Sequence, residues 1–338
     1  MEHDTAQEGA DTSGRINPAD PATAPSRLRV SPDLAGLRAD AYLFRELPLL
    51  SRTRIRQKIQ MGESLLNGRR YSTATRLRAG DVISVTWRGA PPSGPCPDLD
   101  VLFEDDSLLA VNKPAGVASH PMGKHQTGTV VQFARRRFQE TIRESLRRGD
   151  LSFYPTLVNR LDVFTSGIVL VAKTRAMHKA MQALITRRLV AREYIALVEG
   201  SLGDEEGLIE LPIGPDPTSG VRVKMACRSD GRKSSTRYTV IEHLPGHTLV
   251  SVRPLTGRQH QIRVHFAALG HPVVGDLLYK DEALFIAAQE KLPAPRHCLH
   301  AKHARFTHPV TGVEICIEAP VPADFDSVVS ALRARGAP

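Results

Sequence analysis

The chain has 338 residues and a formal net charge of +9, and 41% of its residues are hydrophobic, which is enough for one large domain and one small one. Its apolar residues never run to the length of about 18 that a membrane span requires, and the first 26 residues lack the apolar core of a signal peptide. The four cysteines are scattered, without metal-ligand or disulfide spacing. These features argue against a membrane protein, a zinc module and a secreted disulfide scaffold, and they favour a protein of the reducing cytoplasm.

The first quarter of the chain divides by composition into a tail and a basic module. Residues 1–26 mix Gly, Pro, Ser, Thr and acids with few large apolar side chains, so we expect a disordered tail. Residues 27–89 carry 13 Lys and Arg against five acids, a net charge of +8. This charge indicates a polyanionic partner, most simply nucleic acid, although a solubilising surface would have the same composition.

Short-range patterns within residues 27–88 predict two helices, a tight turn and a strand. One helix is expected over 38–44, and a second begins after Ser51, which can cap it. Asn67-Gly68 is a hairpin turn signal, and residues 82–87 alternate as in a strand. Ile55 and Ile59 share one face of the second helix. The basic side chains of that helix lie on its other faces: Arg52, Arg54, Arg56 and Lys58.

This order of elements resembles the RNA-binding domain named after small-subunit ribosomal protein S-four. The residues that carry the resemblance are Leu50-Ser51-Arg52, Gly62, Asn67-Gly68 and Gly80-Asp81. It implies a small basic α/β domain over residues 27–88, with RNA phosphates bound by the second helix. A small basic fold without a ligand is the alternative. The RNA contacts implied are Arg52, Arg54, Arg56 and Lys58.

Residues 89–98 are rich in proline and glycine, which predicts a linker. The larger domain then spans 99–325, and residues 326–338 are expected to form a tail. Helices are expected over 127–148 and after Thr174, which can cap one. Strands outnumber helices without alternating with them, which favours an α+β fold: a mixed, largely antiparallel sheet with a central cleft and flanking helices. The expected strands are 101–103, 108–111, 168–172, 194–198, 236–242, 248–253 and 314–318.

Asp162 is the first candidate for chemistry. It stands two residues after Arg160 and ahead of the turn Thr165-Ser166-Gly167, which feeds the apolar run 168–172. An acid before such a turn is usually a turn or capping residue. The nearby arginine and the buried strand favour a different interpretation, because they would keep a carboxylate ionised and positioned as a nucleophile or a charge-stabilising group requires.

The second candidate is the segment 254–265. Thr256 and Gln259 have capping-box spacing for a helix start, and Arg263 would project from a face other than that of Ile262. An arginine on a rigid helix can hold a carboxylate in bidentate fashion, although it can also simply coat an exposed helix. His260 and His265 are five residues apart instead of the four of a zinc helix, so no metal site is expected.

A third candidate is Tyr194, at the start of a strand. By itself it is best interpreted as a packing residue, although against nucleic acid it can stack on a base.

Together these segments resemble the RluA-type pseudouridine synthases over residues 98–322. The catalytic motif of that family is similar to Arg160-Leu161-Asp162, and its longest motif to the segment from Thr256 to Asp276. Two positions depart from the family pattern: Asn159 replaces a histidine, and Arg192 replaces a common lysine. The remaining matches are Asn112-Lys113-Pro114, Tyr194-Ile195-Ala196, Leu299-His300-Ala301 and His308-Pro309.

The resemblance implies isomerisation of uridine to pseudouridine in RNA, without a cofactor or a metal. Asp162 corresponds to the catalytic acid, Arg263 to its partner and Tyr194 to the tyrosine beside the target base. Asn159 cannot become cationic, so we expect altered RNA handling or rate and a functional enzyme. The side chains of this domain expected to contact RNA are Arg160, Lys113, Arg258 and His260.

The substrate is expected to be a structured RNA, with large-subunit ribosomal RNA favoured by the extra basic domain and transfer RNA as the alternative. Asn159 leaves room for a non-catalytic RNA-binding or assembly protein on the same scaffold, and the charge alone would also suit an RNA chaperone. Retention of Asp162, Tyr194 and Arg263 favours the enzyme. We expect a monomer.

Overall fold

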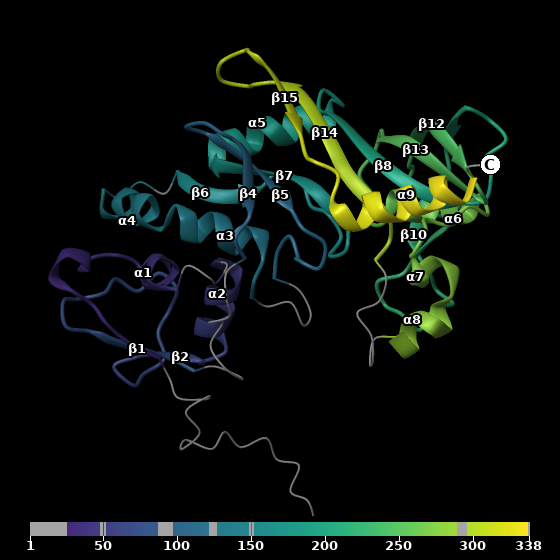
Figure 1. Cartoon of the computed structure of the whole chain (residues 1–338). Helices are drawn as coiled ribbons and strands as arrows, with labels where there is room; N and C mark the ends of the chain where they lie inside the picture. Colours follow the sequence, from purple (N-terminus) through teal and green to yellow (C-terminus); the bar gives the residue numbers. More distant parts are fainter. Residues whose placement is uncertain are drawn as a thin grey trace, which may run out of the picture. The chain divides into compact units, whose positions relative to one another are not determined.

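A computed structural model describes residues 26–47, 50, 52–86, 97–121, 127–148, 150, 152–288 and 296–336. The chain divides into two compact units, residues 1–93 and 94–338, and each is described by itself (Figure 1). The division falls inside the segment expected as a linker. The expected tail up to residue 25, the expected cap Ser51 and most of the linker lie outside the described residues. None of the helices among the described residues has the length and apolar character needed to cross a membrane.

The amino-terminal unit packs two helices on a small antiparallel sheet of strand order β1-β3-β2. Its core includes Leu43, Ile55 and Ile83, all nearly inaccessible to solvent. Asn67 and Gly68 both have positive φ, 48° and 79°, and Leu66 and Arg69 exchange two backbone hydrogen bonds around them, as the predicted tight turn requires. The elements are β1 (Ser26–Arg29), α1 (Ala39–Glu46), α2 (Arg52–Gln60), β2 (Ser64–Leu66) and β3 (Val82–Val85).

The larger unit is built on a ten-stranded sheet of the order β4-β5-β7-β14-β8-β13-β12-β9, with β6 paired to β7 and β15 to β14. Strands β10 (Ile213–Pro215) and β11 (Met225–Cys227) form a separate ribbon. The α+β class and the mixed, largely antiparallel sheet are as the sequence predicted. The strands of the large sheet are β4 (Asp100–Glu104), β5 (Leu108–Lys113), β6 (Phe153–Leu157), β7 (Ser166–Thr174), β8 (Ala191–Glu199), β9 (Glu206–Ile209), β12 (Thr236–Leu244), β13 (His247–Pro254), β14 (Leu299–Thr307) and β15 (Glu314–Glu318).

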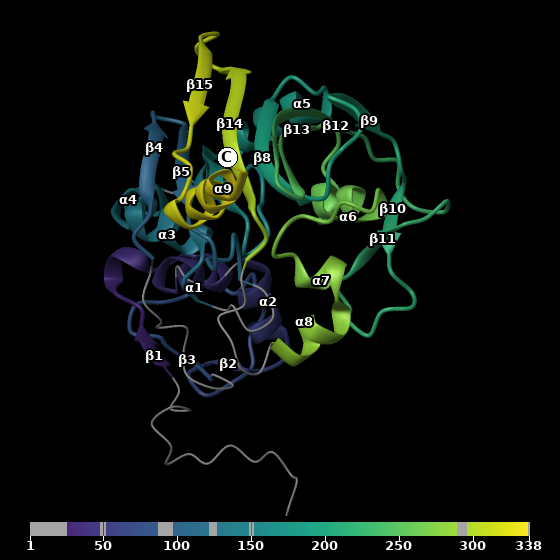
Figure 2. The same cartoon turned by 45° about the vertical axis from the view of Figure 1, so that its right-hand side comes forward.

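Helices cover both faces of this sheet because its central strands are apolar on both sides (Figures 1 and 2). Successive strand residues point to opposite faces, so Val169 and Val171 of β7 pack with α3 and α6, whereas Ile168 and Leu170 pack with α5. Helix α9 packs on β8 and β13 through Phe325. The helices are α3 (Val130–Arg137), α4 (Gln139–Arg147), α5 (Arg175–Thr186), α6 (Gln261–Ala268), α7 (Leu277–Lys280), α8 (Glu282–Ala288) and α9 (Ala323–Gly336).

Two expectations about helices have different outcomes. Thr174 caps α5 as predicted, accepting a hydrogen bond from the Met177 amide at 3.2 Å. The expected tail 326–338 is wrong, because most of it belongs to α9, where Val329 and Leu332 are buried against the sheet. This helix was missed because its buried residues contact strands far away in the sequence.

The pairing of β7 with β14 joins the two halves of the sheet, and Gly167 allows these two strands to approach each other closely. Strands β7 and β14 run parallel there, with Ser166 opposite His300 and Gly167 opposite Ala301. In the described part of the sheet, the other neighbouring strands are antiparallel. Gly167 has a φ of 108°, and a methyl group on its Cα would overlap the Ala301 carbonyl.

Gly167→Ala should therefore lower the free energy of unfolding by at least about 3 kcal/mol, because strained backbone and overlap with another strand act together. Urea denaturation measures the change. Gly246→Ala is the matched control, since Gly246 also has positive φ, 68°, but open space around it, and should cost only about 1 kcal/mol. Equal losses in the two variants would contradict the packing argument.

Candidate active site

Asp162 lies in the connection between β6 and β7, and the backbone around it is fixed by hydrogen bonds. The Ser119 hydroxyl donates to the Leu161 carbonyl at 2.8 Å and accepts from the Leu161 amide at 3.0 Å. On the other side of Asp162, the Val163 carbonyl accepts from the Gly116 amide at 2.9 Å and from Lys113 Nζ at 2.9 Å. Both neighbours of Asp162 are thus held by the last residue of β5 and the segment that follows it, which suits a side chain that has to act at a fixed point.

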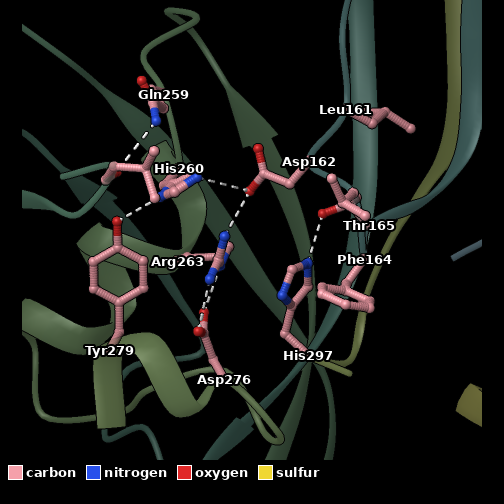
Figure 3. A network of polar contacts seen from close by, with 12 residues as sticks. Leu161, Asp162, Phe164, Thr165, Gln259, His260, Arg263, Asp276, Tyr279 and His297 are labelled. Carbon is pink, nitrogen blue, oxygen red and sulfur yellow. Dashed lines mark hydrogen bonds and ion pairs between the residues drawn. The ribbon is translucent and has the colours of Figure 1, made fainter. Parts of the chain in front are cut away.

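Arg263, on α6, joins Asp162 to a second acid (Figure 3). Its Nη1 donates to Asp162 Oδ2 at 2.9 Å. Its Nε and Nη2 donate to the two carboxylate oxygens of Asp276 at 2.6 and 2.8 Å. The bidentate pair with Asp276 holds the guanidinium plane, so Arg263 can present Nη1 to Asp162 while its Nε and Nη2 stay bonded to Asp276.

The electrostatics of this group keep Asp162 ionised. Burial by itself would raise the pKa of Asp162, but positive charge outweighs it, and the pKa is held well below its ordinary value. His260 and His297 also lie near the carboxylate, yet burial lowers the pKa of both histidines, so Arg263 is the partner that is charged at neutral pH. The pKa of Arg263 is in turn raised, because its two acids outweigh its burial. Asp162 is therefore a carboxylate over the whole physiological pH range.

The carboxylate borders a cavity of about 1000 Å³. Tyr194 enters it from β8 and is 8% exposed, and burial raises the pKa of its hydroxyl, so the phenol stays protonated. Phe164, two residues after Asp162, is 44% exposed. The cavity can receive a planar group beside Asp162. Its lining includes Asn159, Arg160, Asp162, Phe164, Arg192, Tyr194, Arg258, His260, Arg263 and His297.

Asn159 has a structural task in this site. Its Nδ2 donates to the Ile168 carbonyl at 3.2 Å, and its Oδ1 accepts from the Leu170 amide at 2.7 Å. The side-chain amide thus continues the pairing of β6 with β7 beyond the end of β6. Asn159 therefore anchors the Asp162 connection to β7, and the expectation of altered RNA handling or rate stays a prediction.

Asn159→Ala should lower the free energy of unfolding by about 1–3 kcal/mol, because it leaves a backbone amide and a carbonyl of β7 without partners. Asn159→Asp is the matched variant: it keeps the acceptor for the Leu170 amide but loses the donor to Ile168. Denaturation of both variants checks the prediction. Wild-type stability of Asn159→Ala would show that the amide does not hold β7.

The structure contradicts the expected RNA contacts of two lysines, because both side chains are buried. Lys113 is fully buried, and its Nζ donates to the carbonyls of Pro114, Val117 and Val163 at 2.8–2.9 Å. Burial lowers the pKa of Lys113 to about 7, but three acceptors need three N–H groups, so we assign the ammonium form. Lys58 is 6% exposed and donates to Glu63 and to the Thr86 carbonyl. Both ammonium groups donate hydrogen bonds within the protein, so neither is placed to contact RNA.

The other predicted RNA contacts differ in their environment. Arg160 is exposed at the cavity, and the half-buried Arg258 donates to the Lys233 carbonyl at 3.1 Å. In the amino-terminal unit, Arg54 is exposed, Arg56 pairs with Asp40 at 3.4 Å, and Arg52 lies over the Phe44 ring at 4.9 Å. The residues predicted to bind RNA therefore belong to both units, and their roles stay predictions.

The start of α6 differs from the expected capping box. The helix begins at Gln261, and its side-chain oxygen accepts from the Thr256 hydroxyl at 2.7 Å and from the Arg258 amide at 3.0 Å. Gln261 therefore makes the side-chain hydrogen bonds at the start of the helix that were expected of Gln259. The extra two residues place His260 in a left-handed conformation immediately before the helix.

Sequence reasoning missed three residues of the site. Asp276 and Tyr279 flank Arg263, and His297 contacts the Thr165 hydroxyl with Nε2 at 2.7 Å. Asp276 lies at the end of a segment already matched to a family motif, so an acidic residue in that motif could have been proposed as a partner of Arg263. His297 had none, because it is 132 residues from Thr165. Within the described ranges, His, Cys, Asp and Glu side chains form no group of three or more suited to a metal ion.

Comparisons with known proteins agree with this geometry. Residues 107–268 match the family model described as RNA pseudouridylate synthase. The protein of Xanthomonas campestris pv. campestris named ribosomal large subunit pseudouridine synthase D is 37% identical in an alignment of 330 positions that covers 93% of this chain and 95% of that protein. Ribosomal large subunit pseudouridine synthase C of Vibrio vulnificus is 33% identical in an alignment of 316 positions that covers 90% of this chain and 95% of that protein. The human structure titled RNA Pseudouridylate Synthase Domain Containing 1 superimposes with a TM-score of 0.51 at 29% identity, covering 72% of this chain and 98% of its own. The chain belongs to the RluA-type family of RNA pseudouridine synthases.

Proposed function

We propose that this enzyme converts a specific uridine of large-subunit ribosomal RNA to pseudouridine, with Asp162 as the residue that acts on the sugar. The observation that carries the proposal is a single carboxylate, kept ionised by Arg263, at a cavity large enough for a nucleotide. The ribosomal target is supported by the names of the relatives from Xanthomonas and Vibrio. We place the reaction in the cytoplasm. We also propose that the enzyme works as a monomer, because Asp162 and Arg263 pair directly within a single chain.

The reaction is an isomerisation, so atoms balance without a co-substrate. The bond between ribose C1′ and uracil N1 breaks, the uracil rotates and C1′ bonds to C5. C5 then loses its proton and N1 takes one up, so the product is an isomer of uridine. Ionised Asp162 can attack C1′ or remove a proton from the sugar, and Arg263 keeps it ready for either role. Tyr194, whose raised pKa keeps it protonated, is suited to packing against the base and donating a hydrogen bond, and it is a weak base for the C5 proton.

The target base has to leave its stack before this chemistry, at a cost of a few kcal/mol. Exposed Arg160 stands at the cavity, where it can contact the RNA around the displaced nucleotide. For the amino-terminal unit we propose phosphate binding by the exposed arginines of α2, Arg54 and Arg56, consistent with its net positive charge. Stepwise addition of salt should weaken RNA binding by the full chain, because neutralised phosphates release counterions.

The test compares RNA from cells with and without the gene. Carbodiimide treatment and primer extension map pseudouridines in ribosomal and transfer RNA. We expect one or a few stops in the large-subunit RNA to disappear in the deletion and to return with the wild-type gene but not with Asp162→Asn. Lost stops confined to transfer RNA would overturn the ribosomal target. An unchanged stop pattern, or restoration by Asp162→Asn, would overturn the catalytic proposal itself.

A further inference from the structure

His260 has an unusual backbone conformation for its residue type. Its φ and ψ are 54° and 18°, in the left-handed region, and its side chain does not cap the helix that begins next to it. Left-handed conformations are costly for residues other than glycine and persist where the surroundings enforce them, often at functional sites. The conformation places an 11% exposed imidazole between Asp162 and α7 (Figure 3).

Tyr279, on α7, holds one nitrogen of this imidazole. Its hydroxyl oxygen is 2.7 Å from His260 Nδ1 and accepts a hydrogen bond from the Met225 amide at 3.1 Å. A backbone amide can only donate, so this contact uses an acceptor position of the hydroxyl and leaves its proton for Nδ1. The Tyr279 ring also lies over the Arg263 guanidinium at 5.0 Å, which fixes its position.

A neutral histidine that accepts at Nδ1 carries its proton on Nε2. His260 Nε2 is 3.9 Å from Asp162 Oδ2, the same oxygen that receives the hydrogen bond from Arg263. That distance exceeds a hydrogen bond, but catalytic contacts are often long in a free enzyme and tighten when substrate binds. Among the described residues, both groups approach Asp162 at Oδ2, so Oδ1 is the oxygen left for the sugar.

We propose that Tyr279 and His260 form a positioning pair, in which Tyr279 fixes the His260 proton on Nε2 and this N–H, together with Arg263, holds Asp162 Oδ2 so that Oδ1 faces the substrate. The proposal rests on the proposed function of Asp162. It assigns His260 a place beside the carboxylate, in addition to any contact with RNA.

The first experiment reads the tautomer in the full chain without RNA. Two-bond ¹H–¹⁵N spectra of histidine-labelled protein distinguish protonated Nδ1 from protonated Nε2, and His260→Gln assigns the signal. We expect the Nε2-protonated form in the wild type and a loss of that preference in Tyr279→Phe. Protonation at Nδ1 in the wild type would overturn the proposal.

The second experiment measures tritium release from total RNA of deletion cells grown with uracil labelled at C5, which contains every candidate substrate. Groups that orient a functional side chain are commonly worth about 10- to 100-fold in activity. We expect kcat to fall about tenfold in Tyr279→Phe and about 100-fold in His260→Leu, with KM changed by less than about threefold. His260→Gln, which keeps an N–H donor, should recover part of the loss. Tyr238→Phe, which removes the hydroxyl of another buried tyrosine of this unit, is the control and should keep wild-type kcat.

A third variant separates positioning from folding. His260→Gly adopts the left-handed conformation freely, so its Tm should equal or exceed that of the wild type while its kcat falls as in His260→Leu. Wild-type kcat in His260→Leu and Tyr279→Phe, with Asp162→Asn inactive, would overturn the positioning pair and leave the proposed function intact. Tritium release by Asp162→Asn would instead overturn the proposed function.

Discussion

Asp162→Asn protein should bind its RNA as tightly as the wild type and release tritium from C5 on the order of 10⁴-fold more slowly, the scale at which removal of a reacting carboxylate acts. The asparagine side chain has nearly the same shape but is neutral, so it can neither attack C1′ nor take a proton from the sugar. Arg263 keeps its two hydrogen bonds to Asp276, so we expect a change of less than about 1 kcal/mol in the free energy of unfolding. Single-turnover tritium release, filter binding and urea denaturation measure the three quantities.

The control for this variant is an ordinary turn acid. Asp150 accepts hydrogen bonds from the Ser152 amide and hydroxyl at 2.7 and 2.9 Å, which is the role a lone acid before a turn usually has. Asp150→Asn should leave tritium release unchanged. If Asp162→Asn lost activity only in proportion to lost stability or lost RNA binding, Asp162 would be a turn acid as well.

Arg263→Met should lower the free energy of unfolding by about 3–5 kcal/mol, because removing one partner of a buried ion pair leaves uncompensated charge. Asp276 is 2% exposed and loses both hydrogen bonds from Arg263. The same change should alter the pH profile. In the wild type, the depressed pKa of Asp162 keeps it ionised; without Arg263, burial raises that pKa, so activity should fall as the pH decreases and recover as it rises. Urea denaturation and kcat between pH 5 and pH 9 check both effects.

A double variant tests the cause of the instability. Arg263→Met combined with Asp276→Leu contains no lone buried carboxylate at position 276, so it should regain much of the lost stability. Its activity should stay low, because Asp162 still lacks its cation. Arg263→Lys keeps the charge but lacks the planar fork that serves two acids, and we expect intermediate values. A double variant no more stable than Arg263→Met would contradict the ion-pair explanation.

Local patterns in the sequence predicted local structure well. The turn at Asn67-Gly68 and the cap at Thr174 depend on residues within three or four positions, and both are as predicted. The strands of the sheet were visible as apolar runs because the central ones are buried on both faces. The mixed sheet with flanking helices followed from the order of these runs.

Long-range contacts were beyond such patterns. The link from Asp162 to Arg263 spans 101 residues, and it was expected only because both residues lie in motifs of a known family. Lys113 is a prediction that failed for the same kind of reason. Its charge suggested an RNA contact, but the side chain is buried, and its ammonium group donates to three carbonyls from two different loops. Whether a lysine is exposed depends on packing that its neighbours in the sequence do not show. Tyr279 was missed for the same reason.

The parallel junction between β7 and β14 has a consequence for how the enzyme is made. Its partners Ser166 and His300 are 134 residues apart, and contacts of such separation form late because the intervening loop must close first. On a ribosome the first half of the sheet emerges well before β14. The Thr165–His297 contact and the guanidinium of Arg296, which donates to the Phe164 carbonyl at 3.3 Å, arrive only just before β14. A nascent or truncated chain that stops before residue 296 therefore lacks the contacts that complete the Asp162 connection and should not modify RNA.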